Sequence, residues 1–235
     1  MILAIAAALA AAPVAHAAEA PKPCPELVTV DALVCRALEA KSNGNPQSAA
    51  QAFEEAAKIS SRKDGGTARM WAAAGNMWIA ADQPGKAAPA LDKALELPGL
   101  RADQRGEALL DRARAAEAQD DLKTARAKIT EAAALIPDDP FYWYFSAALA
   151  IRENDPVSAQ AAIDKALALA PSDQTILFEA GHVAHLRGDD DKARSYWADS
   201  ARSNPRSEIG KEAAKAAELL GVTPVLAGQA PPPSR

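Results

Sequence analysis

Small and bulky apolar residues recur along the chain in a fixed order. The pattern is anchored on alanines that follow one another at offsets of 38, 38, 34 and 34 residues, at Ala49, Ala87, Ala125, Ala159 and Ala193. Four residues after each anchor stands a bulky apolar side chain, at Phe53, Leu91, Ile129, Ile163 and Trp197. Three residues further stands a small one, at Ala56, Ala94, Ala132, Ala166 and Ser200. Positions spaced in this way share one face of an α-helix, so the pattern predicts one amphipathic helix per unit.

A second helix is predicted before each of these helices. Sixteen residues before each anchor stands a large apolar residue, at Leu33, Trp71, Leu109, Trp143 and Leu177. Four residues later comes a small residue that lets two helices lie close together, at Ala37, Gly75, Ala113, Ala147 and Gly181. A turn former separates the two helices, at Gly44, Asp82, Asp120, Asn154 and Gly188, and a proline closes four units, at Pro98, Pro137, Pro171 and Pro205. Each unit therefore reads as helix, tight turn, helix and exit.

A helical hairpin with these columns resembles the tetratricopeptide repeat, whose period is 34 residues. The resemblance covers about residues 30 to 207, and it is strongest in the last two units. It implies an all-α fold, a right-handed α-solenoid of about five tetratricopeptide helical hairpins plus a C-terminal capping helix. Residues 207 to 220 form that amphipathic cap, which Gly221 ends. Slightly longer helices are expected to absorb the four extra residues that separate units one and two, and units two and three.

The first residues indicate export. An apolar, Ala-rich run from Ile2 to Val14 precedes the triplet Ala15-His16-Ala17, so residues 1–17 are expected to be a signal peptide cut after Ala17. No Lys or Arg precedes Lys22, which leaves an uncleaved anchor or a misplaced start codon as alternatives. Export predicts a periplasmic or secreted bacterial protein. The other expected segments are a Pro-rich arm at 18–29, the solenoid with its cap at 30–220 and a disordered Pro-rich tail at 221–235.

The two cysteines, Cys24 and Cys35, stand eleven residues apart. In an oxidising compartment an even cysteine count favours a disulfide, which would tie the arm to the first helix. In the chain-entropy description such a bond stabilises the fold by roughly 3 kcal/mol. The alternative is a pair of free thiols, one on the arm and one buried.

The composition excludes several classes of function. A net charge of −5, with 26 basic and 31 acidic residues, argues against nucleic-acid binding. No nucleophile elbow, phosphate loop or dinucleotide fingerprint occurs, so neither an enzyme nor a cofactor is expected. Glu179, His182 and His185 diverge around a helix and lack the spacing of a metal site. The run Asp189-Asp190-Asp191 is expected to cap a helix rather than hold calcium.

In the tetratricopeptide family the first helix of each unit lines a concave groove, so the resemblance implies a partner-binding face there. We expect Trp71, Trp78, Trp143, Trp197 and Phe53 in the core. The groove is then predicted to be polar and partly basic near units two and three, with Arg69, Asn76, Arg114 and Glu117, and aromatic near units four and five, with Phe141, Tyr144, Phe178, His182 and His185. The alternative is that Phe141 and Tyr144 pack against the preceding unit and that Phe178 is partly buried.

Some members of the family bind a C-terminal carboxylate through Lys, Asn and Arg. Asn76 matches one such position, but Ala72 replaces the Lys, and Glu107 and Asp111 replace basic residues. A carboxylate clamp is therefore not expected. The resemblance favours a non-catalytic adaptor or scaffold of the bacterial envelope that binds a peptide or partner segment. The alternatives are a small-molecule or glycan binder, with Phe141, Tyr144 and Phe178 as stacking platforms, and an accessory subunit of an envelope enzyme.

Overall fold

The computed structural model describes residues 24–61 and 65–221, and over these residues the chain contains helices and no strands. The helices are α1 (Val30–Ser42), α2 (Pro46–Ile59), α3 (Gly66–Ala80), α4 (Pro84–Glu96), α5 (Ala102–Glu117), α6 (Leu122–Ala132), α7 (Pro140–Arg152), α8 (Pro156–Leu169), α9 (Gln174–Leu186), α10 (Asp190–Ser203) and α11 (Glu208–Gly221). The predicted signal peptide, the first part of the predicted arm and the tail from residue 222 lie outside the described residues.

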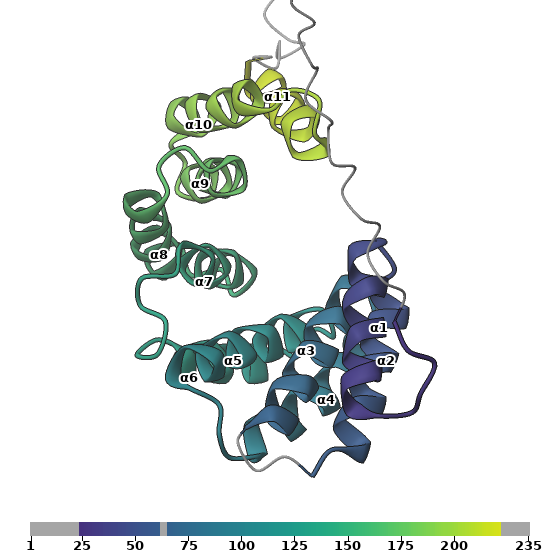
Figure 1. The fold of residues 1–235 in the computed structure, drawn as a ribbon. Coiled ribbons are helices and arrows are strands. Elements are labelled where there is room, and N and C mark those ends of the chain that lie inside the picture. The colour runs from purple at the N-terminus through teal and green to yellow at the C-terminus, as the bar shows by residue number, and fades with distance from the viewer. Residues whose placement is uncertain (1–23, 62–64, 222–235) are drawn as a thin grey trace, which may run out of the picture.

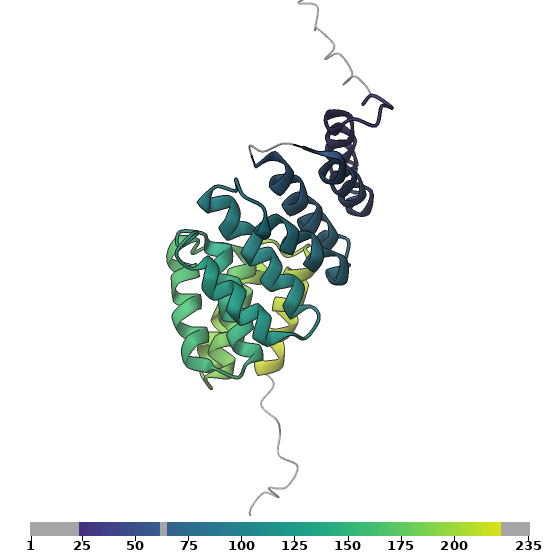
Figure 2. The same ribbon diagram turned by 90° about the horizontal axis from the view of Figure 1, so that it is seen from below.

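Consecutive helices pair into hairpins, and the hairpins stack into an arc (Figure 1). The described residues form five such hairpins, from α1/α2 to α9/α10, and α11 packs against both helices of the last one. The first helices α5, α7 and α9 lie on the inner side of the arc, while α6, α8 and α10 lie outside (Figure 1). Figure 2 shows the same stack from below, with the helices of neighbouring hairpins side by side. The prediction of an all-α solenoid of hairpins with a terminal cap is confirmed.

All five predicted turn formers adopt the left-handed backbone conformation. The φ angles are +68° at Gly44, +54° at Asp82, +62° at Asp120, +56° at Asn154 and +80° at Gly188. Gly, Asn and Asp tolerate this conformation better than other residues, which is why the column contains only these three types. In four hairpins the next residue caps the second helix with its side chain, at Asn45, Asp121, Asp155 and Asp189. The capping role expected for the acidic run at Asp189 is thereby confirmed.

The repeat columns form the core. The five anchoring alanines and the five small residues seven positions later are all fully buried, including Ser200, whose hydroxyl donates to the Gln174 carbonyl at 2.9 Å. The apolar residues gather into four clusters. The first spans the first two hairpins and reaches α5, the next two each join one hairpin to the next, and the last joins α9 and α10 to α11. Trp143 is the exception among the predicted core aromatics. It is half-buried, because its indole packs at the outer edge of two clusters beneath the ammonium of Lys165, 3.9 Å away.

The first helices of units two and three are longer than those of the other units. Helices α3 and α5 have 15 and 16 residues, whereas α1, α7 and α9 have 13 each. The lengthened helices absorb part of the four extra residues in these units, whereas the prediction assigned all of them to the helices.

The N-terminal arm is fastened to α1. Cys24 and Cys35 form a disulfide with their Cα atoms 5.7 Å apart. The guanidinium of Arg36 donates to the carbonyls of Pro25 and Leu27 at 2.6 and 3.1 Å. The arm therefore follows the first helix closely at this point. Within the described residues, no helix is both long and apolar enough to cross a membrane.

Candidate partner-binding cleft on the concave face

A cleft of about 460 Å³ opens between α3, α5 and the first turn of α7. Helix α3 contributes residues spaced three and four apart, and α5 does the same, so each presents one face to the cleft. The cleft is lined by Arg69, Ala72, Ala73, Asn76, Leu100, Gln104, Glu107, Ala108, Leu110, Asp111, Arg114, Asp139 and Phe141. The cleft is open because Ala72 and Ala73 of α3 have small side chains, and the polar side chains of α5 border it. This volume lies within the range of about 300–1,000 Å³ that is typical of ligand sites.

Asp111 ties the two helices together at the back of the cleft. Its carboxylate accepts from the Asn76 amide of α3 at 2.7 Å and from the Arg114 guanidinium at 2.9 Å. Burial raises the pKa of Asp111, and the hydrogen bonds from Asn76 and Arg114 only partly oppose this. Asn76 and Arg114 therefore serve first to hold a desolvated carboxylate, and each keeps only its remaining donors for a ligand.

Glu107 lies one helical turn before Asp111 on the same face of α5. Within the described part of the chain its carboxylate has no hydrogen bond or ion pair. Burial raises the pKa of Glu107, and the nearby carboxylates of Asp103, Asp111 and Asp139 raise it further. The lining contains three carboxylates, of Glu107, Asp111 and Asp139, and two guanidinium groups, of Arg69 and Arg114, so the cleft carries an excess of negative charge, unlike the partly basic groove predicted for these units.

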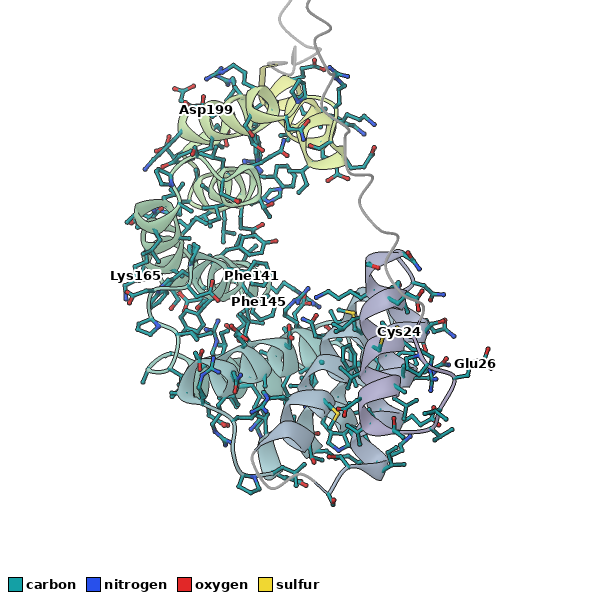
Figure 3. The ribbon with its side chains drawn as sticks, in the orientation of Figure 1. Cys24, Glu26, Phe141, Phe145, Lys165 and Asp199 are labelled. Atoms are coloured by element: carbon teal, nitrogen blue, oxygen red, sulfur yellow. A yellow bond between two sulfur atoms is a disulfide. The ribbon has the colours of Figure 1, made fainter. Side chains whose placement is uncertain are left out.

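Phe141 forms the apolar wall of the cleft. Its side chain is 39% exposed, and the Arg114 guanidinium carbon lies 5.2 Å from the ring centre. The Asp139 side chain caps the start of α7 by accepting from the Phe141 backbone N–H at 2.8 Å, which fixes this residue at the rim. Figure 3 shows Phe141 and Phe145 on the side of α7 that faces α5. An exposed aromatic ring beside polar groups is a common anchor for a protein ligand.

Tyr144 stands behind Phe141, with the two ring centres 5.3 Å apart. It is half-buried, and burial is the main cause that raises the pKa of Tyr144 to about 12, helped by the nearby carboxylate of Glu179. Tyr144 therefore stays a neutral hydrogen-bond donor at physiological pH. Its ring supports Phe141 more than it faces the cleft.

The remaining predicted aromatic residues form a separate cluster between α9 and α10. His182 packs edge-on against Phe178 and Trp197, with ring centres 4.5 and 5.5 Å apart. Trp197 donates its indole N–H to the Phe178 carbonyl at 3.0 Å. His185 lies at the end of α9 and contacts Asp190 through its Nδ1 at 2.8 Å. These contacts join the two helices of the fifth hairpin, and they leave Phe178 and His182 half-buried and His185 exposed.

The structure thus regroups the predicted site residues. Arg69, Asn76, Arg114 and Phe141 gather in the cleft, whereas Phe178, His182 and His185 lie apart from it. Phe141 therefore belongs with the polar residues and not with an aromatic half of the groove. Glu117, expected on the same face of α5, instead pairs with Arg152 of α7.

Sequence reasoning did not include Gln104, Glu107, Asp111 and Asp139 among the binding residues. The repeat register contains the missing signal. Arg69, Glu107 and Phe141 each stand two residues before the large apolar residue of their unit, at Trp71, Leu109 and Trp143. Equivalent positions of successive repeats lie side by side on the same face of a solenoid. The register by itself therefore places Glu107 next to Arg69 and Phe141.

No group of three or more His, Cys, Asp or Glu side chains suited to a metal ion occurs in residues 24–61 and 65–221. The carboxylates of the cleft are held by side-chain and backbone donors, or, at Glu107, remain unpaired. The chemistry that the cleft offers is recognition by hydrogen bonds, charge and an aromatic contact.

No protein-family model and no curated protein sequence matches the chain. Solved structures do. PilF of Pseudomonas aeruginosa superimposes with a TM-score of 0.64 at 19% identity, over 80% of this chain and 82% of PilF. PilW, a widely conserved type IV pilus biogenesis factor, gives 0.65 at 18% identity, over 79% and 82%. The tetratricopeptide-repeat protein YrrB gives 0.56 at 15% identity, over 78% and 91%. With its repeat columns and stacked hairpins, the chain is therefore a protein of the tetratricopeptide-repeat fold.

Proposed function

We propose that this protein is a non-catalytic adaptor of the bacterial cell envelope, and that it binds an extended peptide or partner segment in the cleft between α3, α5 and α7. The observation that carries the proposal is the cleft itself, which combines an exposed aromatic ring with hydrogen-bonding side chains. Proteins of this fold bring such faces together on successive repeats, so that an extended ligand can contact several units at once.

One of the similar solved structures supports a peptide as the ligand of the cleft. YrrB is a tetratricopeptide-repeat protein with a peptide-binding site. The cleft of this protein suits a chain segment because it is open and bordered by three different helices. Phe178 and Tyr144, which a glycan would need as stacking platforms, are half-buried in packing contacts. The geometry therefore favours a peptide over a sugar.

The envelope assignment rests on two features. The first seventeen residues have the order of an export signal. The Cys24–Cys35 disulfide is of the kind that persists in oxidising compartments. Fractionation of cells that express the full-length chain tests the assignment. Release of a shortened protein by osmotic shock supports it, whereas an uncut protein in the cytosol contradicts it.

Peptide selection tests the binding function. Random peptides displayed on phage are selected on the immobilised protein, and the affinity of labelled hits is then measured by fluorescence anisotropy. Phe141→Ala is expected to weaken the selected peptides about tenfold, because a central aromatic anchor contributes on the order of 1 kcal/mol or more. Failure to select any peptide would contradict the proposal.

Leu169→Ala provides a matched control. Leu169 is an apolar residue at the end of α8 that is 42% exposed, close to the 39% of Phe141, but it lies outside the cleft. Its replacement is expected to leave affinity unchanged. Equal losses in both variants would show that binding depends on general surface hydrophobicity and not on this cleft.

A further inference from the structure

The acidic side chains that line the cleft differ in whether they have hydrogen-bond or ion-pair partners. Asp111 is held by Asn76 and Arg114, and Asp139 accepts from the backbone at the start of α7. Arg114 is engaged by Asp111 and lies beside the Phe141 ring. Glu107 is the acidic residue of the cleft that has no partner among the described residues. The cleft therefore contains one carboxylate whose charge is left for a ligand.

The surroundings of Glu107 oppose its own charge. Asp103, Asp111 and Asp139 all act on it as like charges, and the opposing charge is that of Arg101. Arg101 is itself paired with Asp103 at 2.7 Å. A cation placed against Glu107 would relieve this repulsion and gain a charge-assisted hydrogen bond in a partly desolvated cleft.

The position of Glu107 fixes where such a cation belongs. Glu107 and Phe141 occupy equivalent places in successive units, and both line the same cleft. A ligand residue against Glu107 and another against the Phe141 ring would therefore lie next to each other along one bound segment. The aliphatic part of a Lys or Arg side chain can also cover the apolar floor formed by Ala72 and Ala108.

We propose that Glu107 is a specificity-determining residue that selects partner segments carrying a Lys or Arg next to an apolar residue that contacts Phe141. This inference rests on the proposed peptide-binding function and adds the chemistry of the occupant. The carboxylate of Glu107 supplies the charge that complements the ligand, whereas Asp111, Asn76 and Arg114 form the wall of the cleft.

Two short peptide libraries test the proposal with the full-length protein. They are identical except that the central position is fixed as Lys or Arg in one and as Gln in the other. We expect selection to succeed mainly with the basic library. For a selected basic peptide, Glu107→Gln is expected to weaken binding about tenfold or more, because a neutral amide replaces the charged acceptor of the hydrogen bond. The same peptide with Gln in place of its basic residue should bind the wild type and Glu107→Gln equally.

Glu131→Gln is the charge-matched control. Glu131 lies on α6, pairs with Lys128 at 2.8 Å and is outside the cleft. The substitution Glu131→Gln removes the same charge from the protein as Glu107→Gln, and it should leave the affinity for the basic peptide unchanged. Circular dichroism confirms that each variant is folded.

The outcomes separate the two proposals. Equal enrichment of the Lys/Arg and Gln libraries, or an unchanged affinity in Glu107→Gln, overturns the role of Glu107 and leaves peptide binding intact. A loss of similar size in Glu131→Gln overturns it as well, because a general charge effect then explains the result. Failure of both libraries overturns the proposed function together with this inference.

Discussion

At the scale of single residues, the fold buries the carboxyl group of Asp111 and so disfavours its charged form. Burial raises the pKa of its carboxyl above the ordinary value, so the folded state disfavours the charged form relative to the unfolded state. By linkage, Asp111 contributes stability below the unfolded pKa of about 3.9, and this contribution is lost as the pH rises through the higher folded value. The contacts of Asp111 with Asn76 and Arg114 therefore position the wall of the cleft at some expense of stability.

Asp111→Asn tests this balance. The variant keeps the shape of the side chain, and Asn76 can turn its amide so that its carbonyl accepts from the new amide. We expect a melting temperature at pH 7 at or above that of the wild type, with the difference shrinking as the pH falls towards 4. Thermal unfolding followed by circular dichroism across this range measures it. A variant that is less stable than the wild type, by an amount that grows as the pH rises from 4 to 7, would show that the lost ion pair with Arg114 outweighs desolvation.

At the scale of helices, the regular spacing of residues in the sequence predicts the buried positions and the turns of each hairpin. The anchoring alanines, their small partners and the left-handed turn residues recur because each hairpin solves the same packing problem. The cleft is less predictable because it depends on which side chains neutralise one another. Asn76 looks free for a ligand in the sequence, yet it donates to Asp111, which is 35 residues away. The repeat columns place equivalent positions of α3 and α5 side by side, but they do not show which side chains at non-equivalent positions, such as Asn76 and Asp111, reach one another.

The column of small residues in the first helices sets how closely a hairpin can pair. A Cβ atom added at Gly181 would collide with the indole of Trp197, whereas the equivalent Ala147 is accommodated by Ile163. Gly181→Ala is therefore expected to destabilise the protein by about 1–3 kcal/mol through overpacking. Adding Trp197→Ile recreates the Ala–Ile pair of unit four and should recover part of the loss.

Denaturant unfolding of the two single variants and the double variant gives the coupling energy of this pair. A favourable coupling of at least about 0.5 kcal/mol is expected for side chains in direct contact. Strictly additive losses would mean that the backbones of α9 and α10 separate to admit the methyl group, and that the glycine is not required by the indole.

At the scale of the whole molecule, the main helix contacts within the described residues join neighbouring hairpins, so stability is expected to be transmitted from each hairpin to the next. Each apolar cluster joins adjacent pairs, and the last one joins α9 and α10 to α11. A solenoid of this kind needs its terminal helix because the final hairpin would otherwise expose its apolar face. Loss of α11 should therefore loosen the C-terminal hairpin and leave the distant cleft intact.

Two aspartate substitutions on α11 test this expectation. Ala213 is 0% exposed in the last cluster, whereas Leu219 is 65% exposed on a different face of the same helix. Ala213→Asp places an unpaired charge in an apolar contact, at an expense of several kcal/mol that exceeds what one short helix can offset, so α11 should detach. Hydrogen exchange should then accelerate in α9 and α10 and remain unchanged in α1 to α4, while Leu219→Asp alters neither region. Faster exchange throughout the chain in Ala213→Asp would mean that the arc unfolds as one cooperative unit, and that nearest-neighbour contacts do not describe its stability.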